Sequence, residues 1–445
     1  MRPVDLSVGG AEDLGRPLHD LCSRLFPICR SITGDGVRET LRILQDWIPL
    51  ELHEVPTGTQ VLDWEVPLEW NLGAAYIENE QGERVIDAAH HNLHVLGYST
   101  PVDAVMSRDE LDAHLFSLPD QPDLIPYRTS YYASKWGFCL SHRQRQALPS
   151  GNYRAVIDSS LEPGSLTYGE FFIPGQTQQE LLISTHVCHP SLANDNLSGI
   201  SVATYLAKHF RDVPLRYGIR FVFVPATIGA ITWLACNEHR LDDIVGGLVI
   251  SGVGDAGPFT YKRSRSGTGV VDRVFEHLLG SGQDDNSIRP FIPYGYDERQ
   301  YCSPGIGIPA GCLMRTPFGE YPEYHTSGDN LDLVSASALG EALSLCVEAI
   351  TRIQYVAQYR NMSPKGEPQL GRRGLYDMLG GDNDTKQAQL ALLWMLNYSD
   401  GSHSTLDVSD LSGLDLAILD LAAQRLSSAE LLSPLPLPRS HKVSV

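Results

Sequence analysis

The middle of the chain alternates short apolar runs with segments of helical periodicity, and this alternation constrains the fold more than any other feature. The apolar runs at residues 181–184, 217–224 and 246–251 are typical of buried strands. The segments between them, residues 198–210 and 228–238, have the apolar spacing of helices that cover a sheet. Because strands that alternate with helices are joined by crossover connections, we expect an α/β fold with a mixed, mostly parallel sheet flanked by helices.

Two other parts of the sequence differ in texture from this region. Residues 61–160 contain short strand-like pieces among many aromatic side chains, which indicates an inserted β-rich subdomain. After a polar segment with Gly and Pro at residues 364–374, three short helical segments follow with the spacing of a winged-helix unit. Periodic segments also predict helices at residues 14–26, 37–47, 270–279 and 335–355. We therefore expect three parts. The α/β domain comprises residues 1–60 and 161–362, the inserted subdomain residues 61–160, and the C-terminal winged-helix-like domain residues 375–435.

The overall charge disfavours nucleic acid as a partner. The 445 residues include 34 Lys and Arg against 54 Asp and Glu, a formal net charge of −20, and such a surface repels phosphate backbones. The last helical segment carries Asp415 and Asp420 against a single Arg425, whereas a helix that reads DNA presents Arg, Lys, Asn or Gln to the groove. We expect the C-terminal unit to serve packing or dimerisation, which leaves a homo-oligomer possible.

The sequence shows no sign of a membrane segment. No apolar run approaches the roughly 18–20 residues needed to span a bilayer, and the first ten residues lack an apolar signal core. We therefore expect a cytoplasmic protein without a membrane partner. The eight cysteines are scattered, with no CxxC pair, as is typical of reduced thiols. A catalytic thiol stays open at Cys188 or Cys302, although most single cysteines are small core residues.

The stretch THVCHPSLANDNLSG, residues 185–199, places candidate metal ligands at the end of a strand. His186 directly follows the apolar strand, and Asp195 lies in a turn just before the next helix. Open α/β sheets bind ligands at the carboxyl ends of their strands, and imidazole with carboxylate is a usual ligand set for zinc. His189 precedes Pro190, and two roles stay open for it: a metal ligand, or a group that orients substrate or water.

A second polar segment, EYHTSGDNLD at residues 323–332, offers a third ligand. It contains His325, with polar neighbours such as Asp329 that could bond the free ring nitrogen of that imidazole. An isolated His is more often a structural residue than a ligand, but two His with one carboxylate favour a metal. We predict one zinc ion held by His186, Asp195 and His325, with the open fourth position of a catalytic site.

These segments resemble the zinc aminopeptidase clan, which includes bacterial leucyl aminopeptidases and glutamate carboxypeptidase. The clan's His after a strand, DN-x-SG turn and late HT segment match His186, residues 195–199 and His325 with Thr326, in that order. Over nearly the whole chain the sequence is similar to aminopeptidase-like proteins often associated with polysaccharide biosynthesis, which carry an inserted β subdomain and a C-terminal winged helix. The pieces that carry this closer resemblance are DWEVPLEWN (63–71), NLHVLGYS (92–99), SYYASKWGFCL (130–140), YGYDERQYCSPG (294–305) and EYHTSGDNLD.

The chain differs from the clan at two places, each directly after a strand. The clan has paired glutamates after the strand that follows the first motif, one a general base and the other a ligand to a second metal. Ala226 and Thr227 occupy these places here. A further aspartate ligand should follow the strand at 246–251, yet Ser251 stands there and Asp255 comes slightly late. We therefore expect one metal ion rather than two.

Ala226 bears most directly on activity. A methyl group accepts no proton, and general-base assistance is typically worth about 10²–10⁴-fold in rate. Three explanations stay open: an introduced substitution, a natural residue in a protein that binds without cleaving, or another group that serves as the base. The candidates for such a group are His189, Glu323 and Asp255. We expect the Glu-bearing form to be a hydrolase and this chain to be severely impaired.

Substrate contacts are expected from residues 297–305, which look like a substrate loop in the closer group. The candidate residues on it are Asp297, Glu298, Arg299 and Tyr301. An acidic side chain there could hold a free amine and Arg299 could hold a carboxylate, while the alternative is a solvated surface loop with internal ion pairs. Weaker candidates of the same kind are Glu170 and Arg30.

Taken together, the sequence favours a zinc-dependent aminopeptidase-like hydrolase that cleaves an amide of a small peptide or an aminoacylated small molecule. The alternative is a non-catalytic zinc-containing protein that binds or scaffolds an amine-bearing ligand. A third reading, a regulator that acts through the C-terminal unit, is disfavoured by the acidic composition.

Overall fold

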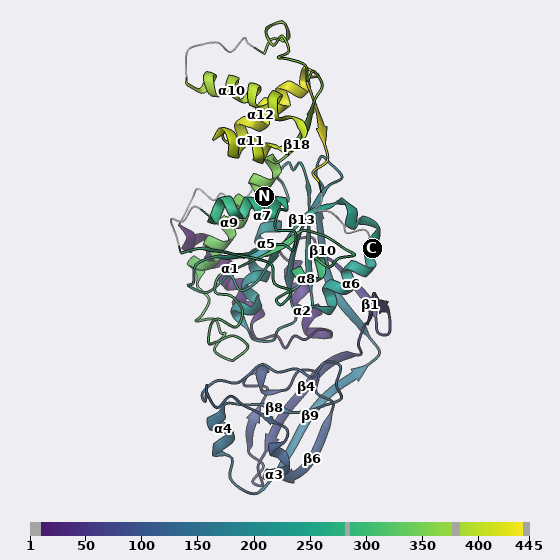
Figure 1. Cartoon of the computed structure of the whole chain (residues 1–445). Helices are drawn as coiled ribbons and strands as arrows, with labels where there is room; N and C mark the ends of the chain where they lie inside the picture. Colours follow the sequence, from purple (N-terminus) through teal and green to yellow (C-terminus); the bar gives the residue numbers. More distant parts are fainter. Residues whose placement is uncertain (1–9, 281–284, 376–382, 439–445) are drawn as a thin grey trace.

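The structure, a computed structural model, describes residues 10–280, 285–375 and 383–438. Three parts follow one another along the long axis of the molecule, with the α/β domain in the middle, the inserted subdomain at one end and the C-terminal domain at the other (Figure 1). Among the described residues, no helix is both long enough and apolar enough to cross a membrane.

An eight-stranded mixed sheet forms the centre of the α/β domain. Its strands, in spatial order, are β1 (Glu51–Pro56), β10 (Ser165–Ile173), β12 (Gly218–Val224), β11 (Glu180–His186), β13 (Ile244–Ile250), β16 (Ala310–Met314), β14 (Thr260–Lys262) and β15 (Ser287–Arg289). The central strands β12, β11, β13 and β16 are parallel, and β14 pairs in parallel with β15, while β1, β10 and the β14–β16 pair add antiparallel contacts. The expected mixed, mostly parallel sheet is confirmed.

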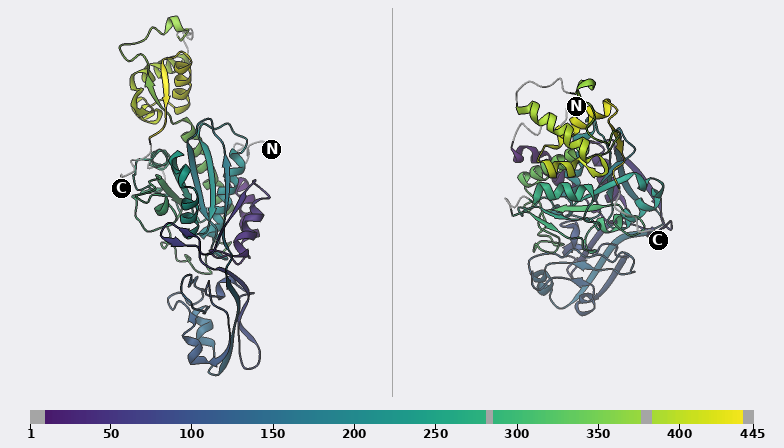
Figure 2. Two further views of the ribbon diagram at one scale, coloured as in Figure 1. Left: turned by 90° about the vertical axis from the view of Figure 1, so that its right-hand side faces the viewer. Right: turned by 45° about the horizontal axis from the view of Figure 1, so that its top comes forward.

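Helices cover both faces of this sheet, as Figure 2 shows from two further sides. One face packs against α1 (Ala11–Leu25), α2 (Asp35–Leu44), α5 (Gly199–Phe210), α7 (Val270–Leu279) and α9 (Ala336–Tyr355). The other packs against α6 (Ile228–Cys236) and α8 (Glu298–Tyr301), with the 3-10 helix Glu238–Asp243 following α6. Within β11, Leu181 and Ile183 face the first set and Leu182 faces the second. Burial on both faces explains why the central strands read as continuous apolar runs.

The inserted subdomain lies between β1 and β10. Its four-stranded antiparallel sheet has the order β5 (Arg84–Asp87), β4 (Glu69–Glu78), β9 (Asn152–Glu162) and β6 (Val102–Ser107). The smaller elements are β2 (Gln60–Val61), β3 (Trp64–Glu65), the 3-10 helix Asn92–His94, α3 (Arg108–Asp112), β7 (Leu115–Phe116), β8 (Phe138–Cys139) and α4 (His142–Ala147). Two residues, 163 and 164, join β9 to β10, and β1, which precedes the insert, pairs antiparallel with β10. The subdomain is therefore attached to the main sheet through two neighbouring strands at its edge.

The C-terminal domain combines three helices with a three-stranded sheet. The helices are α10 (Asn383–Tyr398), α11 (Thr405–Ser412) and α12 (Leu416–Ser428), and the strand order is β18 (Asp400–Ser404), β17 (Gln358–Asn361), β19 (Leu432–Leu435). Strand β17 pairs with both other strands, so it belongs to this domain, although we assigned residues up to 362 to the α/β domain. Its four residues carry no apolar run that would have marked it as a strand. The 3-10 helix Gly371–Arg373 lies in the connection to α10.

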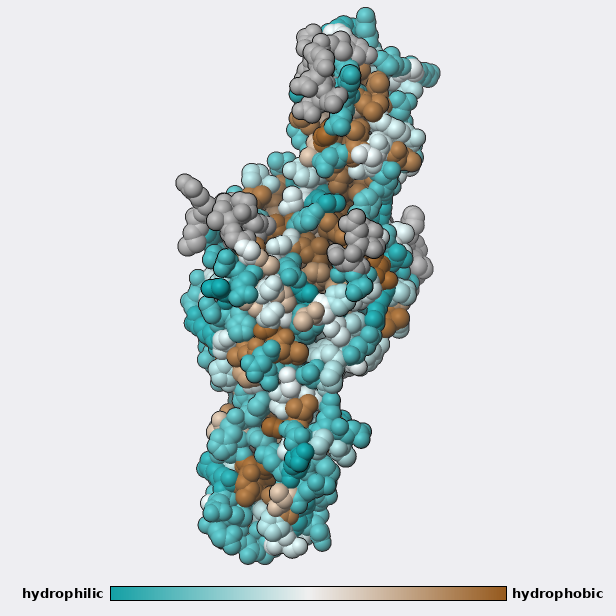
Figure 3. Space-filling view, turned by 90° about the vertical axis from the view of Figure 1, so that its left-hand side faces the viewer, coloured by the Kyte–Doolittle hydropathy of each residue, from teal (hydrophilic) through white to brown (hydrophobic). Residues whose placement is uncertain are grey.

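The C-terminal domain docks on the α/β domain through its acidic side chains. Asp420 of α12 is 5% exposed and forms an ion pair of 2.5 Å with Arg216. Asp407 pairs with Arg273 at 2.7 Å. The surface on the side shown in Figure 3 is mostly hydrophilic, with hydrophobic patches on the C-terminal domain and the adjoining part of the α/β domain. The aspartate that makes α12 a poor DNA-reading helix is therefore used for packing between domains.

Candidate metal centre

The centre forms at the carboxyl end of strand β11. His186 is the last residue of that strand, and Asp195 lies in the irregular helical turn Ala193–Ser198 that leads into α5. His325 arrives from the long connection between β16 and α9. The carboxyl ends of the parallel strands thus gather these side chains at one edge of the sheet, where open α/β sheets bind their ligands.

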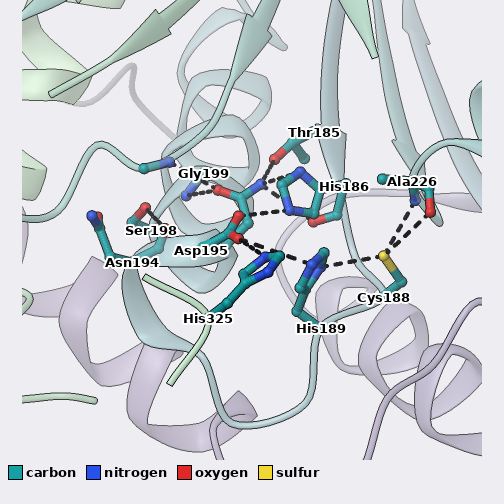
Figure 4. Close-up of polar contacts among 12 residues, drawn as sticks. Thr185, His186, Cys188, His189, Asn194, Asp195, Ser198, Gly199, Ala226 and His325 are labelled. Carbon is teal, nitrogen blue, oxygen red and sulfur yellow. Dashed lines mark hydrogen bonds and ion pairs between the residues drawn. The ribbon is translucent and has the colours of Figure 1, made fainter. Parts of the chain in front are cut away.

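Asp195 is the centre of this cluster (Figure 4). Its Oδ1 lies 2.9 Å from Nε2 of His186, and its Oδ2 lies 3.0 Å from Nε2 of His325 and 3.9 Å from Nε2 of His189. The side chains of His186 and Asp195 are fully buried, while that of His325 is 36% exposed. Each oxygen of one buried carboxylate is therefore within reach of an imidazole. The side chain of His189 is 12% exposed, so the cluster is open on the side of His189 and His325.

The protonation states around Asp195 suit a metal. Burial would raise the pKa of the Asp195 carboxyl, but the three imidazoles outweigh burial and hold that pKa well below its ordinary value. Burial lowers the pKa of His189 well below its ordinary value, so this imidazole is neutral. Ionised carboxylate and neutral imidazole are the forms that bind zinc.

The donor set fits a metal ion in its spacing as well. His186, His189 and Asp195 each offer a ligand atom, and these atoms all lie within 4.8 Å of one another. His325 joins the group through its contact with Asp195. The group that meets this spacing therefore contains His189, whereas the set that we predicted has His325 in that place.

A network of hydrogen bonds holds the turn that carries Asp195. The Asp329 carboxylate accepts from the backbone N–H groups of Asn194 (2.5 Å) and Asp195 (3.0 Å). Asn196 donates from its amide to Oγ1 of Thr185 at 2.8 Å. We expected Asp329 to support His325, but it supports the Asp195 turn instead. Burial and the neighbouring Asp195 charge raise the pKa of Asp329 to about 7.

A pocket of about 390 Å³ opens directly beside the cluster. The residues that line it on the α/β side include His189, Ala226, Thr227, Arg299 and His325. The opposite wall comes from the inserted subdomain and consists of Tyr127, Arg128, Thr129 and Tyr131. The remaining lining residues are Tyr294, Gly295, Tyr296, Phe318 and Tyr324. The two tyrosines of the insert belong to the aromatic-rich region of the sequence, but nothing in the sequence placed them, or Arg128, at this site.

The position of the expected general base faces this pocket. Ala226 follows β12, and its backbone N–H donates to Sγ of Cys188 at 3.3 Å (Figure 4). Thr227 lines the pocket beside it. Ser251, where the clan's further aspartate ligand was expected, is fully buried at the end of β13. A methyl group therefore stands where the resemblance implies a carboxylate.

Two of the three substitutes for the base lie elsewhere. Asp255 is 4% exposed, and its carboxylate accepts from the Asn194 amide (2.9 Å) and the Thr316 hydroxyl (2.7 Å), so it is occupied. Glu323 is not among the described residues that line the pocket. His189 does line it, and its backbone oxygen accepts from Nε of Arg30 at 2.9 Å. His189 is the candidate that the geometry leaves in place.

The predicted substrate loop is mostly buried. Arg299 lines the pocket, whereas Asp297, Glu298 and Tyr301 are 0% exposed. Glu298 forms an ion pair with Lys262, and the Tyr301 hydroxyl lies 2.8 Å from Oγ of Ser184. None of these three residues has exposed surface at the pocket, contrary to the expectation that they contact substrate. The short helix α8 turns Glu298 and Tyr301 into the core, where its N-cap residue Asp297 is also buried, while Arg299 and Gln300 are partly exposed.

The weaker candidates are structural as well. Glu170 pairs with the buried Arg220 and accepts from the indole N–H of Trp233 at 2.6 Å. Arg30 is 1% exposed and donates to backbone oxygens, including that of His189. Burial raises the pKa of the Cys188 thiol, which disfavours the nucleophilic thiolate. Cys302 is buried and donates to Ala310 O at 3.2 Å, so neither cysteine has the surroundings of a catalytic thiol.

The chain is similar to known proteins over nearly its whole length. The profile of a family described as a domain of unknown function (DUF4910) matches residues 19–355, and a winged helix-turn-helix profile matches residues 357–434. A protein of Clostridium acetobutylicum, whose name provisionally assigns it to polysaccharide biosynthesis with an aminopeptidase-like domain, is 45% identical over 97% of this chain and 99% of its own length.

Solved structures agree in fold. A crystal structure of a provisionally named peptidase from Clostridium acetobutylicum has a TM-score of 0.84 and 44% identity, covering 96% of this chain and 97% of that one. The zinc aminopeptidase BSAP from Bacillus subtilis has a TM-score of 0.57 and 13% identity, covering 77% of this chain and 94% of that one. The expected aminopeptidase-like fold and C-terminal winged helix are confirmed.

Proposed function

Because the chain belongs to the DUF4910 family and has an aminopeptidase-like fold, we propose that it is a zinc-dependent hydrolase of small amides whose turnover is impaired by Ala226. The expected substrate is a small peptide or an aminoacylated small molecule. The observation that carries the proposal is the cluster of His186, Asp195 and His325 beside a pocket.

The residues of the cluster have separable tasks in this proposal. His186, Asp195 and His325 would hold one zinc ion, with His189 as the alternative ligand. Zinc in this place would polarise the amide carbonyl and lower the pKa of water. Asp329 fixes the turn of Asp195 through two backbone N–H groups, so the carboxylate is held in place before any ligand binds.

His189 is the group that could move a proton in this pocket. It is neutral, and its ring lies 5.3 Å from that of His325. Its Nδ1 is 3.3 Å from Sγ of Cys188, which leaves Nε2 on the side of Asp195. A carboxylate on the side chain of residue 226 would provide a second proton acceptor in the pocket, and its absence predicts a rate lower by about 10²–10⁴-fold.

A second function follows from the same position. With Ala226 and Thr227 in place of acidic side chains, the pocket retains a metal cluster and substrate walls without a strong base. A protein of this kind would bind its ligand at the zinc and release it unchanged. Binding without turnover is therefore the alternative.

Restoring a glutamate at residue 226 distinguishes hydrolysis from binding without turnover. We would compare the unmodified chain with Ala226→Glu for hydrolysis of a panel of aminoacyl amides and dipeptides in the presence of zinc. We expect Ala226→Glu to hydrolyse at least one of them about 10²-fold or more faster. Ala226→Gln is the matched control, because it has nearly the size of Glu but accepts no proton at neutral pH.

The outcomes discriminate between the functions. Equal activity of all three forms would show that residue 226 is not the position of the base. If no form turns over any substrate although each binds one zinc ion per chain by elemental analysis, the binding function is favoured. Ala226→Glu combined with His186→Ala should be inactive, since it lacks the metal cluster.

A further inference from the structure

The charge of the pocket is opposite to that of the chain. Lys and Arg number 34 and Asp and Glu 54 in the sequence, yet none of the described residues that line the pocket is acidic and two of them are arginines, Arg128 and Arg299. We propose that this pocket recognises an anionic group, a carboxylate or a phosphate, of a ring-bearing substrate rather than a free amine. The inference rests on the proposed function, whose substrate class it specifies.

Within the part of the chain that the structure describes, no ion pair occupies the guanidinium of Arg299. Its Nε is buried and has no hydrogen-bond acceptor, and among the described residues no carboxylate lies within ion-pair distance of it. By contrast, Arg220 of the same α/β domain forms an ion pair of 2.7 Å with Glu180. The Nε of Arg108 and that of Arg315 are unpartnered in the same way, but each of these arginines forms an ion pair through another nitrogen. Because buried polar groups nearly always have partners, a guanidinium at the wall of a pocket without any ion pair points to an acceptor on a ligand. A guanidinium binds carboxylate and phosphate oxygens in a bidentate way.

Arg128 brings a second positive charge from the inserted subdomain. Its side chain is exposed, and none of the ion pairs of the described residues includes it. The backbone around it is nevertheless fixed, because Gly97 donates to the Arg128 oxygen at 2.9 Å and Tyr127 donates to the His325 oxygen at 2.8 Å. The two arginines therefore approach the same pocket from different parts of the fold.

A free amine would find no acidic side chain among the described residues that line the pocket. An ammonium ion requires a carboxylate or several oxygen acceptors, and the two acidic residues of the substrate loop, Asp297 and Glu298, are 0% exposed. The carboxylate of Asp195 is already engaged by imidazoles. An amine in this pocket would meet two arginines and no carboxylate of the lining, and this charge repulsion opposes its binding.

Aromatic side chains form the rest of the wall. Of the described residues that line the pocket, six carry an aromatic six-membered ring: Tyr127, Tyr131, Tyr294, Tyr296, Phe318 and Tyr324. The Tyr324 ring stacks on His325 at 3.9 Å between centroids, and the Tyr296 ring on His186 at 5.1 Å. A flat or cyclic group between such rings would carry its anionic substituent to the arginines, and the metal cluster lies beside it.

Four small probes test this inference by calorimetry on the full chain. They share a phenyl ring: N-acetyl-phenylalanine carries a carboxylate, phenyl phosphate a phosphate, phenylalaninamide a free amine, and N-acetyl-phenylalaninamide no charge. Each is titrated into zinc-loaded protein and into chelator-treated protein. We expect at least one anionic probe to bind about tenfold or more tightly than both amides in both preparations, as a charge-assisted contact implies.

Substitutions then assign the contact. Arg299→Gln and Arg128→Gln should each weaken the anionic probe about tenfold and leave the neutral probe unchanged, with Arg299→Lys intermediate because it keeps the charge but loses the fork. Arg352→Gln is the matched control, since Arg352 lies on α9, is half-exposed and pairs with Glu348. Circular dichroism verifies that each variant folds. If the Arg299 variants fail to fold, Arg128→Gln still tests the inference, because the side chain of Arg128 is exposed.

The results are decisive in either direction. A preference for carboxylate or for phosphate identifies the source of the anion and supports the inference. Equal binding of the four probes, tighter binding of phenylalaninamide, or an anion preference that disappears with the metal but survives both arginine substitutions would overturn it. Because no turnover is measured, this inference can fail while Ala226→Glu proves active, and it can hold while the hydrolase proposal fails.

Discussion

The backbone N–H of Tyr127 donates a hydrogen bond of 2.8 Å to the carbonyl oxygen of His325. Tyr127 belongs to the inserted subdomain, and His325 is a candidate metal ligand of the α/β domain. The same two segments exchange further contacts, since Ser327 donates its N–H to the Ile125 oxygen at 2.8 Å and accepts the Ile125 N–H on its hydroxyl at 3.0 Å. The insert is therefore part of the site and not a separate appendage.

Ser327→Ala tests this coupling. The substitution removes the acceptor of the buried Ile125 N–H, and an unsatisfied group of this kind costs about 1–3 kcal/mol of stability. Since His325 lies on the same segment, we also expect zinc affinity to fall roughly tenfold, as is usual when an outer contact of a metal site is lost. Chelator competition and urea unfolding measure the two effects. Ser337→Ala, which removes an exposed contact with Glu341, should change neither.

Much of the fold could be predicted because it is encoded locally. Helix α7 has the bounds expected from the sequence, Val270–Leu279, since glycines flank an amphipathic segment on both sides. The central strands were recognisable because both of their faces are buried. Strand β17, by contrast, is defined only by its partners β18 and β19, and its residues Gln358–Asn361 carry no periodic signal of their own.

The residues of the site also fall into those that the local sequence predicts and those that depend on distant parts of the chain. His186 and Asp195 are nine residues apart on one strand and turn, so their proximity follows from the local pattern. The burial of Tyr301 depends on Ser184, far away in the sequence, and could not be inferred from a polar-looking loop. The positions of Arg128 and Tyr127 in the pocket wall could not be predicted, because they depend on how the insert folds back on the residues around His325.

The Lys262–Glu298 ion pair should prove structural. Both side chains are at most 3% exposed, so a single substitution leaves an unpaired buried charge. We expect Lys262→Met to destabilise the chain by about 3–5 kcal/mol and the double variant Lys262→Met with Glu298→Leu to cost clearly less. A double-mutant cycle in urea unfolding measures the coupling. If Glu298 held a substrate amine instead, Glu298→Leu would weaken ligand binding with little coupling to Lys262.

The buried Asp297 predicts a specific dependence of stability on pH. Burial, with a contribution from Glu298, raises the pKa of Asp297 to about 7, above its ordinary value of 3.8. Between these two values the folded chain keeps a proton that the unfolded chain has lost, so this group lowers the free energy of unfolding as pH rises, by at most about 1.4 kcal/mol per pH unit. Above pH 7 its contribution is constant.

Asp297→Asn removes this contribution. We expect the variant to gain stability relative to the unmodified chain as pH rises from 5 to 7, and the difference to level off at pH 8. Urea unfolding in the presence of a chelator at each pH measures it. A difference that is independent of pH would mean that Asp297 is ionised throughout, with an ordinary pKa.

Substitution of His189 and of His325 decides the ligand set of the metal. The two oxygens of Asp195 lie 2.9 Å from Nε2 of His186 and 3.0 Å from Nε2 of His325, whereas Nε2 of His189 is 3.9 Å away. We therefore expect His325→Ala to lower zinc affinity by more than about 100-fold, beyond the 10–100-fold typical of outer contacts, and His189→Ala to stay within that smaller range. Elemental analysis and chelator competition give the affinities, and His239→Ala, at an exposed site, is the control. If His189→Ala loses the metal and His325→Ala keeps it, the ligands are His186, His189 and Asp195, and His325 is free to contact substrate in the pocket that it lines.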